Sequence, residues 1–546
     1  PFNSLVWIFV MAICCCSIII VSLRKYIILP KLSLYILASP FLLIASGFFS
    51  GVEQPLLWFF RLSVVIGGYL FFYSIFQYQL SVRMVSNSLY VLVIFFIIHS
   101  LVSIVQILPG MHMAAIIPNV GNMVPMGIFQ QPNMQASLMA TAVTLAFFMV
   151  SLPDFQFRPV LLKIALVALV FLSSFALFSS GSRIGLIGGA ISLFFMILVR
   201  ISFLKRKPKW LFMMALSLSI GVFSGMQIND GFLNAYSKFE RLSESGKDVR
   251  VHVYRIGFES IIEKPFFGHG IGTFQKVFHE NAAKYQAQLG GVNLIGDGRY
   301  THPHNEILLW GMEGGGVAIL ALLIALIVFL IQLYKVGWKK GGAYFALVFP
   351  ILIHTQVEHP FYVSFYHWFL FLFFSYILFR KNSYFKSVDF SVFGIFFIRV
   401  FAVILFSVSL VFFGKSYLYS YKIGGLIFSG SGTIEELEKM GRHPFFTDIA
   451  SRHMLASLVA HTESPESINY YIDWMENYVE RVPDVGVYID LARMYIKISS
   501  EEKALSTIDY ALYLYPEHSR LLHLKHTIDN NKIDSDLNHN PIINSQ

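Results

Sequence analysis

Charged residues are scarce in this sequence. Only 13% of its 546 residues are Asp, Glu, Lys or Arg, whereas a soluble domain averages about 25%. A globule of this length with so little charge would lack the polar surface that water requires. The 56% apolar content is in turn too high for a disordered chain. The composition therefore excludes an ordinary soluble enzyme and predicts a polytopic membrane protein.

Cysteine is also nearly absent. The three that occur are consecutive, Cys14, Cys15 and Cys16, and they lie inside an apolar run. Adjacent cysteines provide neither a disulfide framework nor the spacing of a metal site, so we interpret them as small apolar residues of a helix. Because the sequence begins with Pro1 and not with Met, we expect further residues upstream of it.

The net charge of +9 is unevenly distributed along the chain. Residues 1–413 carry 29 basic and 14 acidic side chains, whereas residues 414–546 carry 12 basic and 18 acidic ones. The first part is thus basic and apolar, and the second is acidic and polar. This contrast predicts two domains, a membrane body over 1–413 and a tail over 414–546.

Twelve apolar stretches of the body are candidates to cross a bilayer, which takes about 17–25 residues. They run over residues 4–23, 32–50, 56–77, 86–108, 135–152, 159–179, 184–201, 210–228, 306–334, 342–358, 360–379 and 391–413. The predicted fold is therefore all-α, a polytopic membrane protein with about 12 transmembrane helices. Short loops after odd-numbered stretches hold 17 basic residues, so these loops are predicted to face the cytoplasm. At the short loops on the other side there are only Arg61, which lies near the end of a stretch, and Arg183. We expect those loops, the long segment 229–305 and the tail to face outward.

The outward segment 229–305 contains nine basic residues. Long loops do not obey the charge rule, so these residues either cover a solvated domain face or form a surface for an anionic ligand. The run Val251–Ile262 is typical of an amphipathic helix, with Arg250 and Arg255 at its start. A tight turn is predicted after it, at Gly268, Gly270 and Gly272.

The tail carries the signature of a helical repeat. Eight residues have the spacing of one tetratricopeptide repeat: Tyr488, Leu491, Ala492, Tyr495, Ala504, Ile508, Ala511 and Pro516. The small residues let two antiparallel helices approach closely, and Pro516 ends the second helix. Such repeats need neighbours for stability. We expect a small helical tail that binds a partner or caps the membrane body, without chemistry of its own.

The densest polar motif lies where the long outward segment re-enters the membrane, at Thr301-His302-Pro303-His304-Asn305-Glu306. Polar groups at a bilayer boundary are costly unless they have partners. Asn305 can cap the next helix, and His304, with His302 in reserve, could remove a proton from a hydroxyl near neutral pH. Helix capping with interfacial polarity is one alternative. Zinc bound by these two histidines with His269 or His279 is another.

Two further outward loops carry candidate residues. In Ser179-Ser180-Gly181-Ser182-Arg183, the backbone and the guanidinium could hold phosphate oxygens, or Arg183 could simply reach lipid headgroups. The loop Gln131-Pro132-Asn133 enters the fifth apolar stretch. Gln131 and Asn133 either support a site there or form a capping turn.

Together these motifs resemble the O-antigen ligase superfamily of polytopic glycosyltransferases. The resemblance rests on the turn at Arg183, the segment from Arg250 to Gly270, the motif from His302 to Glu306 with Glu313-Gly314-Gly315, and the loop Gln131-Pro132-Asn133. It is specific over about 120–330, and Glu358-His359-Pro360 extends it. Within the superfamily the chain looks most like the bacterial protein O-oligosaccharyltransferases that glycosylate pilin-type proteins. His269 departs from the pattern, because such turns often carry a small or apolar residue there.

The resemblance implies a transfer reaction at the periplasmic face of the bacterial inner membrane. The donor would be an oligosaccharide on undecaprenyl diphosphate, and the acceptor a Ser or Thr hydroxyl of a periplasmic, pilin-like protein. No metal, nucleotide or other cofactor is implied, and no nucleic acid. The residues implied are His304 or His302 for catalysis, Arg183, Arg250 and Arg255 for the diphosphate, and Asn305, Glu306, Gln131 and Asn133 in support.

Two alternatives remain open. The first is the same fold with a sugar acceptor, as in an O-antigen ligase or a polymerase; the tail favours a protein acceptor. The second is a non-enzymatic lipid-glycan transporter, which should carry ionisable residues at mid-membrane. Here such residues cluster at the outward face, with His99 and Arg399 as the main exceptions.

Overall fold

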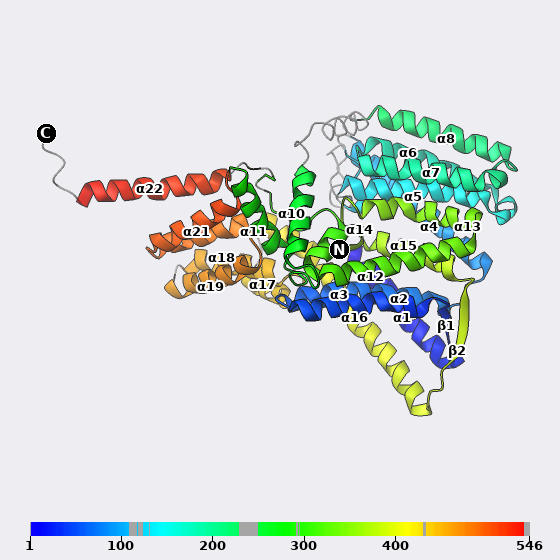
Figure 1. Ribbon diagram of the computed structural model, residues 1–546, viewed down its shortest axis with the longest axis horizontal. Helices are drawn as coiled ribbons and strands as arrows, with labels where there is room; N and C mark the ends of the chain where they lie inside the picture. Colours follow the sequence, from blue (N-terminus) through cyan, green and yellow to red (C-terminus); the bar gives the residue numbers. More distant parts are fainter. Residues whose placement is uncertain are drawn as a thin grey trace.

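A computed structural model describes residues 2–108, 117, 124–129, 131–228, 249–290, 293, 295, 296, 298–429, 433–462 and 464–539. The fold is helical nearly throughout, and long helices run side by side through the body (Figure 1). This confirms the predicted all-α polytopic class. The first part of the long outward segment, residues 229–248, lies outside the described residues, and three of its nine basic residues lie there: Lys238, Arg241 and Lys247.

Ten helices in the described part of the chain are long and apolar enough to cross a membrane. They are α1 (Phe2–Arg24), α2 (Ser33–Ser50), α3 (Pro55–Gln77), α4 (Val82–Ile107), α5 (Pro132–Ser151), α6 (Val160–Ser179), α7 (Arg183–Leu204), α8 (Pro208–Met226), α12 (Glu306–Val336) and α16 (Val392–Ser429). The tenth and eleventh predicted stretches form shorter helices, α13 (Trp338–His354) and α15 (Phe365–Phe379), and α14 (Pro360–Val363) precedes α15. Two 3-10 turns, η1 (Gly127–Phe129) and η2 (Pro153–Phe157), flank α5.

Helix α5 forms the centre of the bundle, since its side chains are buried along its whole length from Met134 to Ser151. Small residues explain the close packing around it. A Cβ added at Gly185 of α7 would lie only 2.4 Å from the Cβ of Ala136 on α5. In membranes, small residues at a helix interface allow this kind of approach. The contact places the start of α7, with Arg183, beside the start of α5, with Asn133.

One element has no counterpart in the prediction from sequence. Residues Tyr26–Pro30 (β1) pair antiparallel with Ser383–Ser387 (β2), with Tyr26 opposite Ser387 and Pro30 opposite Ser383. The two strands follow α1 and α15, on the side predicted to be cytoplasmic. Each strand has only five residues, so neither interrupts the helical plan of the fold.

The outward segment contains two helices, α10 (Val249–Glu263) and α11 (Phe274–Gln288). Between them lies the predicted tight turn. Positive φ angles of 74°, 110° and 96° at its three glycines, Gly268, Gly270 and Gly272, confirm it. α10 runs across the direction of the membrane helices at their outward end (Figure 1).

The glycine turn is joined to a kink in α12. Gly315 has φ 63° and ψ −159°, which interrupts the helix. Four backbone hydrogen bonds bridge the kink and the turn. His269 N donates to Met312 O at 2.8 Å, Gly270 N to Glu313 O at 2.9 Å, Gly316 N to Pro265 O at 2.7 Å, and Val317 N to Phe266 O at 3.1 Å. The joint therefore fixes the first turns of α12, and the motif at their start, relative to the outward segment.

The tail consists of α17 (Ile434–Gly441), α18 (Thr447–Thr462), α19 (Pro465–Arg481), α20 (Val485–Lys497), α21 (Glu501–Leu514) and α22 (Ser519–His539). Ala492, Ala504 and Ala511 are fully buried in the α20–α21 pair, as the repeat spacing predicts. Assignment to the tetratricopeptide class stays a prediction. The predicted domain boundary at 413/414 lies within α16, which continues to Ser429.

The tail lies next to α10 and α11, at the end of the bundle that is predicted to face outward (Figure 1). Ala283 of α11 packs in one cluster with tail residues that include Tyr488 and Tyr515. Arg299 also pairs with Asp484 at the start of α20, at 2.5 Å. Since Arg299 lies only three residues before His302, the tail is in contact with the segment that leads into the polar motif.

Candidate active site

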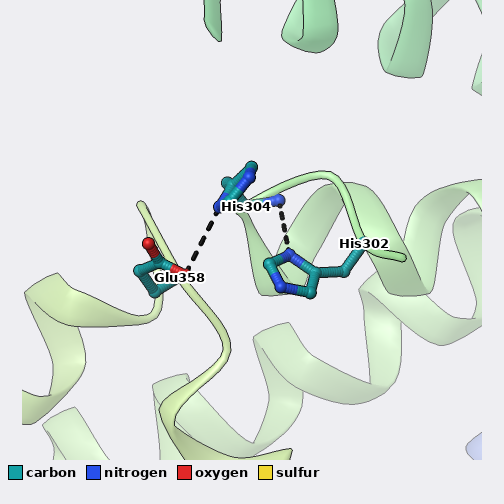
Figure 2. Close-up of side chains that lie close together, drawn as sticks. All are labelled: His302, His304 and Glu358. Carbon is teal, nitrogen blue, oxygen red and sulfur yellow. Dashed lines mark hydrogen bonds and ion pairs between the residues drawn. The ribbon is translucent and has the colours of Figure 1, made fainter. Parts of the chain in front are cut away.

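The candidate site forms where two turns meet at the end of the bundle that is predicted to face outward. His302 and His304 lie on the segment that enters α12, and Glu358 lies on the turn between α13 and α14. Figure 2 shows His304 between the other two side chains. Its Nδ1 lies 3.3 Å from Oε2 of Glu358, and its backbone N–H donates to Nδ1 of His302 at 3.2 Å.

The carboxylate of Glu358 is buried and accepts hydrogen bonds from several side chains. Nδ2 of Asn133 donates to Oε1 at 3.3 Å, and the side chain of Gln131 donates to the same carboxylate. Burial alone would raise the pKa of Glu358. Hydrogen bonds from His304 and Gln131 and the nearby histidine charges outweigh burial and hold its pKa well below the usual value. The carboxylate is therefore ionised at neutral pH.

The backbone at His304 has an unusual conformation. Its φ of 54° lies in the left-handed region, which costs a non-glycine residue of order 1–3 kcal/mol and persists only where the surroundings enforce it. Here the surroundings are Pro303, the Glu358 contact and Tyr254, whose hydroxyl donates to His304 O at 3.2 Å and to Gln356 O at 2.7 Å. In this backbone conformation the imidazole of His304 points toward Glu358.

The contacts of the two histidines differ. A neutral His304 that donates Nδ1–H to Glu358 keeps a lone pair on Nε2, and no described residue bonds to that nitrogen. His302 already accepts the backbone N–H of His304 through Nδ1. Burial, then the neighbouring His359 and His304, lower the pKa of His302 well below its usual value. His304 is therefore better placed to accept a proton, and His302 supports it in the neutral form.

A second pair of polar side chains lies behind His302. The rings of His302 and His359 are 4.5 Å apart, and Nδ1 of His359 lies 3.4 Å from Oε2 of Glu306. Asn305 caps α12 as expected, since its Oδ1 accepts the backbone N–H groups of Ile307 and Leu308 at 2.9 and 3.0 Å. Its Nδ2 donates to Gln356 O, which ties the two turns together.

The three candidate arginines occupy different positions. Arg183 is the first residue of α7, preceded by Ser182, whose hydroxyl accepts the N–H of Gly185 and caps the helix. Arg250, near the start of α10, interacts electrostatically with His354, four residues before Glu358. Arg255 pairs instead with Glu259 at 3.0 Å and lies over the ring of Tyr285. The interaction of Arg250 thus lies next to the turn of Glu358.

A cavity of about 530 Å³ opens beside the site. Helices α2, α3, α12, α13 and α15 line it mainly with apolar and aromatic side chains such as Leu43, Phe72 and Phe329. Glu306, Gln356 and Tyr362 form polar lining next to the site. No described residue supplies a hydrogen-bond partner for Oε1 of Glu306. The cavity could hold an apolar chain whose polar end reaches the histidines.

The same three side chains are also the kind that bind metal ions. The ligand atoms of His302, His304 and Glu358 all lie within 4.8 Å of one another. His269 and His279, considered above for zinc, do not join them. Nε2 of His269 bonds to Ser260 O, and Nε2 of His279 accepts Tyr300 N–H. Amide and imidazole N–H donors already face both oxygens of Glu358. A metal ion bound by Glu358 would have to displace one of these donors.

Reasoning from the sequence missed Glu358 as a site residue. Its turn served only to extend the family resemblance, although Glu358-His359 between two apolar stretches is the same signal that drew attention to His302 and His304. Arg61 lies within α3. It forms a buried ion pair with Glu313 on α12 and lies under the ring of Tyr362, 5.6 Å from its centroid.

Two family models match the chain. One, described as O-Antigen ligase, matches residues 168–323. The other, described as the C-terminal part of a virulence factor membrane-bound polymerase, matches residues 343–527. The first match contains Arg183, Arg250 and the two histidines, and the second contains Glu358 and most of the tail. A comparison with curated proteins finds no match.

Proposed function

The chain belongs to the O-antigen ligase superfamily of membrane glycosyltransferases, and we propose that it transfers a preassembled oligosaccharide from undecaprenyl diphosphate to a Ser or Thr hydroxyl of a pilin-like protein. The membrane would be the bacterial inner membrane, with the site facing the periplasm. The contact between His304 and the ionised Glu358 is the observation that carries the proposal.

In this reaction the acceptor hydroxyl attacks the anomeric carbon of the donor sugar. Nε2 of His304 takes the hydroxyl proton, and Glu358 stabilises the imidazolium that forms. The bond between the anomeric carbon and the diphosphate oxygen breaks, so negative charge grows on the leaving group. Arg183 and Arg250 would neutralise that charge. Arg255 would first have to exchange its partner Glu259 for the diphosphate.

The cavity next to the site supports a lipid-linked donor. Its apolar lining along α2, α3, α12, α13 and α15 suits a polyisoprenoid chain. The polar lining at Glu306, Gln356 and Tyr362 lies beside the turn of Glu358, so a chain bound there would present its diphosphate near the histidines. Glu306, Asn305, Gln131 and Asn133 would support the geometry without touching the reacting atoms.

A sugar acceptor is the second candidate, because the model that matches residues 343–527 is named for a polymerase. One assay separates the two. Purified protein in vesicles is given lipid-linked oligosaccharide with a pilin-like protein, with core lipid, or with no acceptor, and the products are identified by mass spectrometry. We expect glycopeptide from the wild type. Lengthened glycan or glycosylated core lipid without glycopeptide would favour the second candidate.

The same assay tests the role of His304. The His304→Ala variant should lose product while it still binds the lipid-linked donor. His523→Ala, an exposed histidine of α22, is the matched control and should retain full activity. Equal product from all three proteins would contradict the assignment of His304 as the base.

A further inference from the structure

Helix α10 has apolar side chains on two opposite faces. One face is buried and packs on α12, where the Cβ position of Gly257 lies 3.4 Å from the sulfur of Met312. The other face leaves Val251, Phe258 and Ile262 exposed, the last two at 59% and 60%. Leaving such side chains in water is unfavourable, because the burial of apolar surface lowers the free energy. A row of exposed apolar side chains outside the membrane helices therefore indicates that another surface covers it.

The level of α10 relative to the bilayer follows from α12. The apolar part of α12 after the kink, from Val317 to Val336, has 20 residues, which at about 1.5 Å per residue spans roughly the 30 Å of a hydrocarbon core. The outer boundary of that core thus lies near Gly315, where Phe266 bonds to α12. Gly257 contacts α12 about three residues further out, at Met312, which is roughly 5 Å beyond the boundary.

The orientation of α10 is also consistent with a position at the bilayer surface. It runs across the membrane helices and not along them (Figure 1), so it lies nearly in the plane of the bilayer surface. Helices that lie in this plane bury an apolar face about 5–10 Å into the boundary between headgroups and acyl chains.

The exposed face of α10 is continuous with the lipid-facing surface of the bundle. Phe267 contacts Phe49 at the outward end of α2, with ring centroids 5.2 Å apart, and Phe48 and Phe49 are both exposed. Aromatic side chains gather at this level in membrane proteins. Arg255 and Lys264 are exposed alongside the apolar residues and can reach lipid phosphates.

We propose that α10 is an interfacial helix that inserts Val251, Phe258 and Ile262 into the outer leaflet. Phe266, three residues after the end of α10, inserts with them. The occupant of the exposed face is then the lipid surface. This inference does not depend on the proposed reaction, but it has a consequence for it. Tyr254 of the same helix holds the carbonyl oxygens of His304 and Gln356, so the bilayer surface sets the height of the His304 turn above the membrane.

Spin-label accessibility tests the proposal in the full-length protein. Cys14, Cys15 and Cys16 are replaced by Ala, a nitroxide is attached at Phe258→Cys or Ile262→Cys, and the protein is placed in phosphatidylethanolamine and phosphatidylglycerol vesicles. Tyr470→Cys, at an exposed position of α19, is the matched control. We expect the ratio of collisions with oxygen to collisions with a water-soluble nickel chelate to be several-fold higher at 258 and 262 than at 470.

Other outcomes would overturn the proposal. A ratio at 258 and 262 equal to that at 470 would mean that water covers this face. Protection from both reagents, or broadening between labels, would mean that a second copy covers it, and protection that appears only when an acceptor protein is added would assign the face to that protein. A Phe258→Trp variant that keeps all cysteines gives an independent measurement. Its added fluorescence should be quenched by brominated lipid, whereas that of Tyr470→Trp should not.

Discussion

Replacing Gly315 with alanine should break the joint between α12 and the outward segment. A Cβ at this position would lie 2.5 Å from the backbone nitrogen of Gly268 and from the carbonyl group of Phe266, and backbone atoms there cannot rotate away. The φ of 63° adds about 1–3 kcal/mol of strain for a residue with a side chain. Loss of one or two of the four bridging hydrogen bonds adds roughly 1 kcal/mol each. The expected destabilisation is therefore about 2–5 kcal/mol.

Gly316→Ala is the matched control, because its Cβ would meet only Pro265 O, at 3.1 Å, and its φ is not positive. The assay is thermal unfolding in detergent, followed by glycan transfer at a temperature where both variants are folded. We expect Gly315→Ala to unfold several degrees below Gly316→Ala and to transfer glycan more slowly, since the joint also positions the turn of His304. Equal unfolding temperatures and rates for the two variants would refute this reasoning.

Four further predictions concern the buried charges, the tail and the site. Arg61→Met should destabilise the protein by about 3–5 kcal/mol because it leaves Glu313 buried and unpaired, and the double variant Arg61→Met/Glu313→Leu should recover most of that loss in thermal unfolding. Asp484→Asn should remove about 0.5–1 kcal/mol and hasten proteolysis of the tail at low salt, because the Arg299 pair is partly exposed; the same cleavage rate as wild type would contradict this. The folded pKa of Glu358 is lowered from 4.5 to about 2, so its stabilising effect is complete above about pH 4.5 and is lost as the pH falls toward 2. The difference in unfolding temperature between wild type and Glu358→Gln should accordingly shrink between pH 7 and pH 3. Transfer should persist after dialysis against EDTA, and activity that is lost and then restored by zinc would instead make the site a metal centre.

The membrane helices could be predicted because their signal is local. Runs of apolar residues place each helix, and the cap of α12 follows from Asn305 alone. The end of α16 could not be found in this way, because the residues after 413 mix Lys415, tyrosines and glycines yet remain helical. The β1–β2 ribbon could not be predicted from the sequence for another reason. It joins Tyr26 to Ser387, which are separated by about two thirds of the chain, and five-residue strands carry little pattern.

The candidate site, too, could be predicted from the sequence only in part. His302 and His304 stand out in the sequence because they are concentrated at a predicted membrane boundary. The partner of His304 does not, since Glu358 lies 54 residues away and only the packing of α12 against α13 brings the two turns together. Asn133 is more distant still, 225 residues from Glu358. Its contact depends on α5 at the centre of the bundle, which no local pattern reveals.

The central claim is that Glu358 makes His304 an effective base. Its most direct test is kcat for transfer from a lipid-linked oligosaccharide, measured at neutral pH for the wild type and for Glu358→Gln. We predict that the variant loses roughly 10²–10⁴-fold in kcat, with little change in KM for the donor. The same kcat in both proteins would contradict the claim.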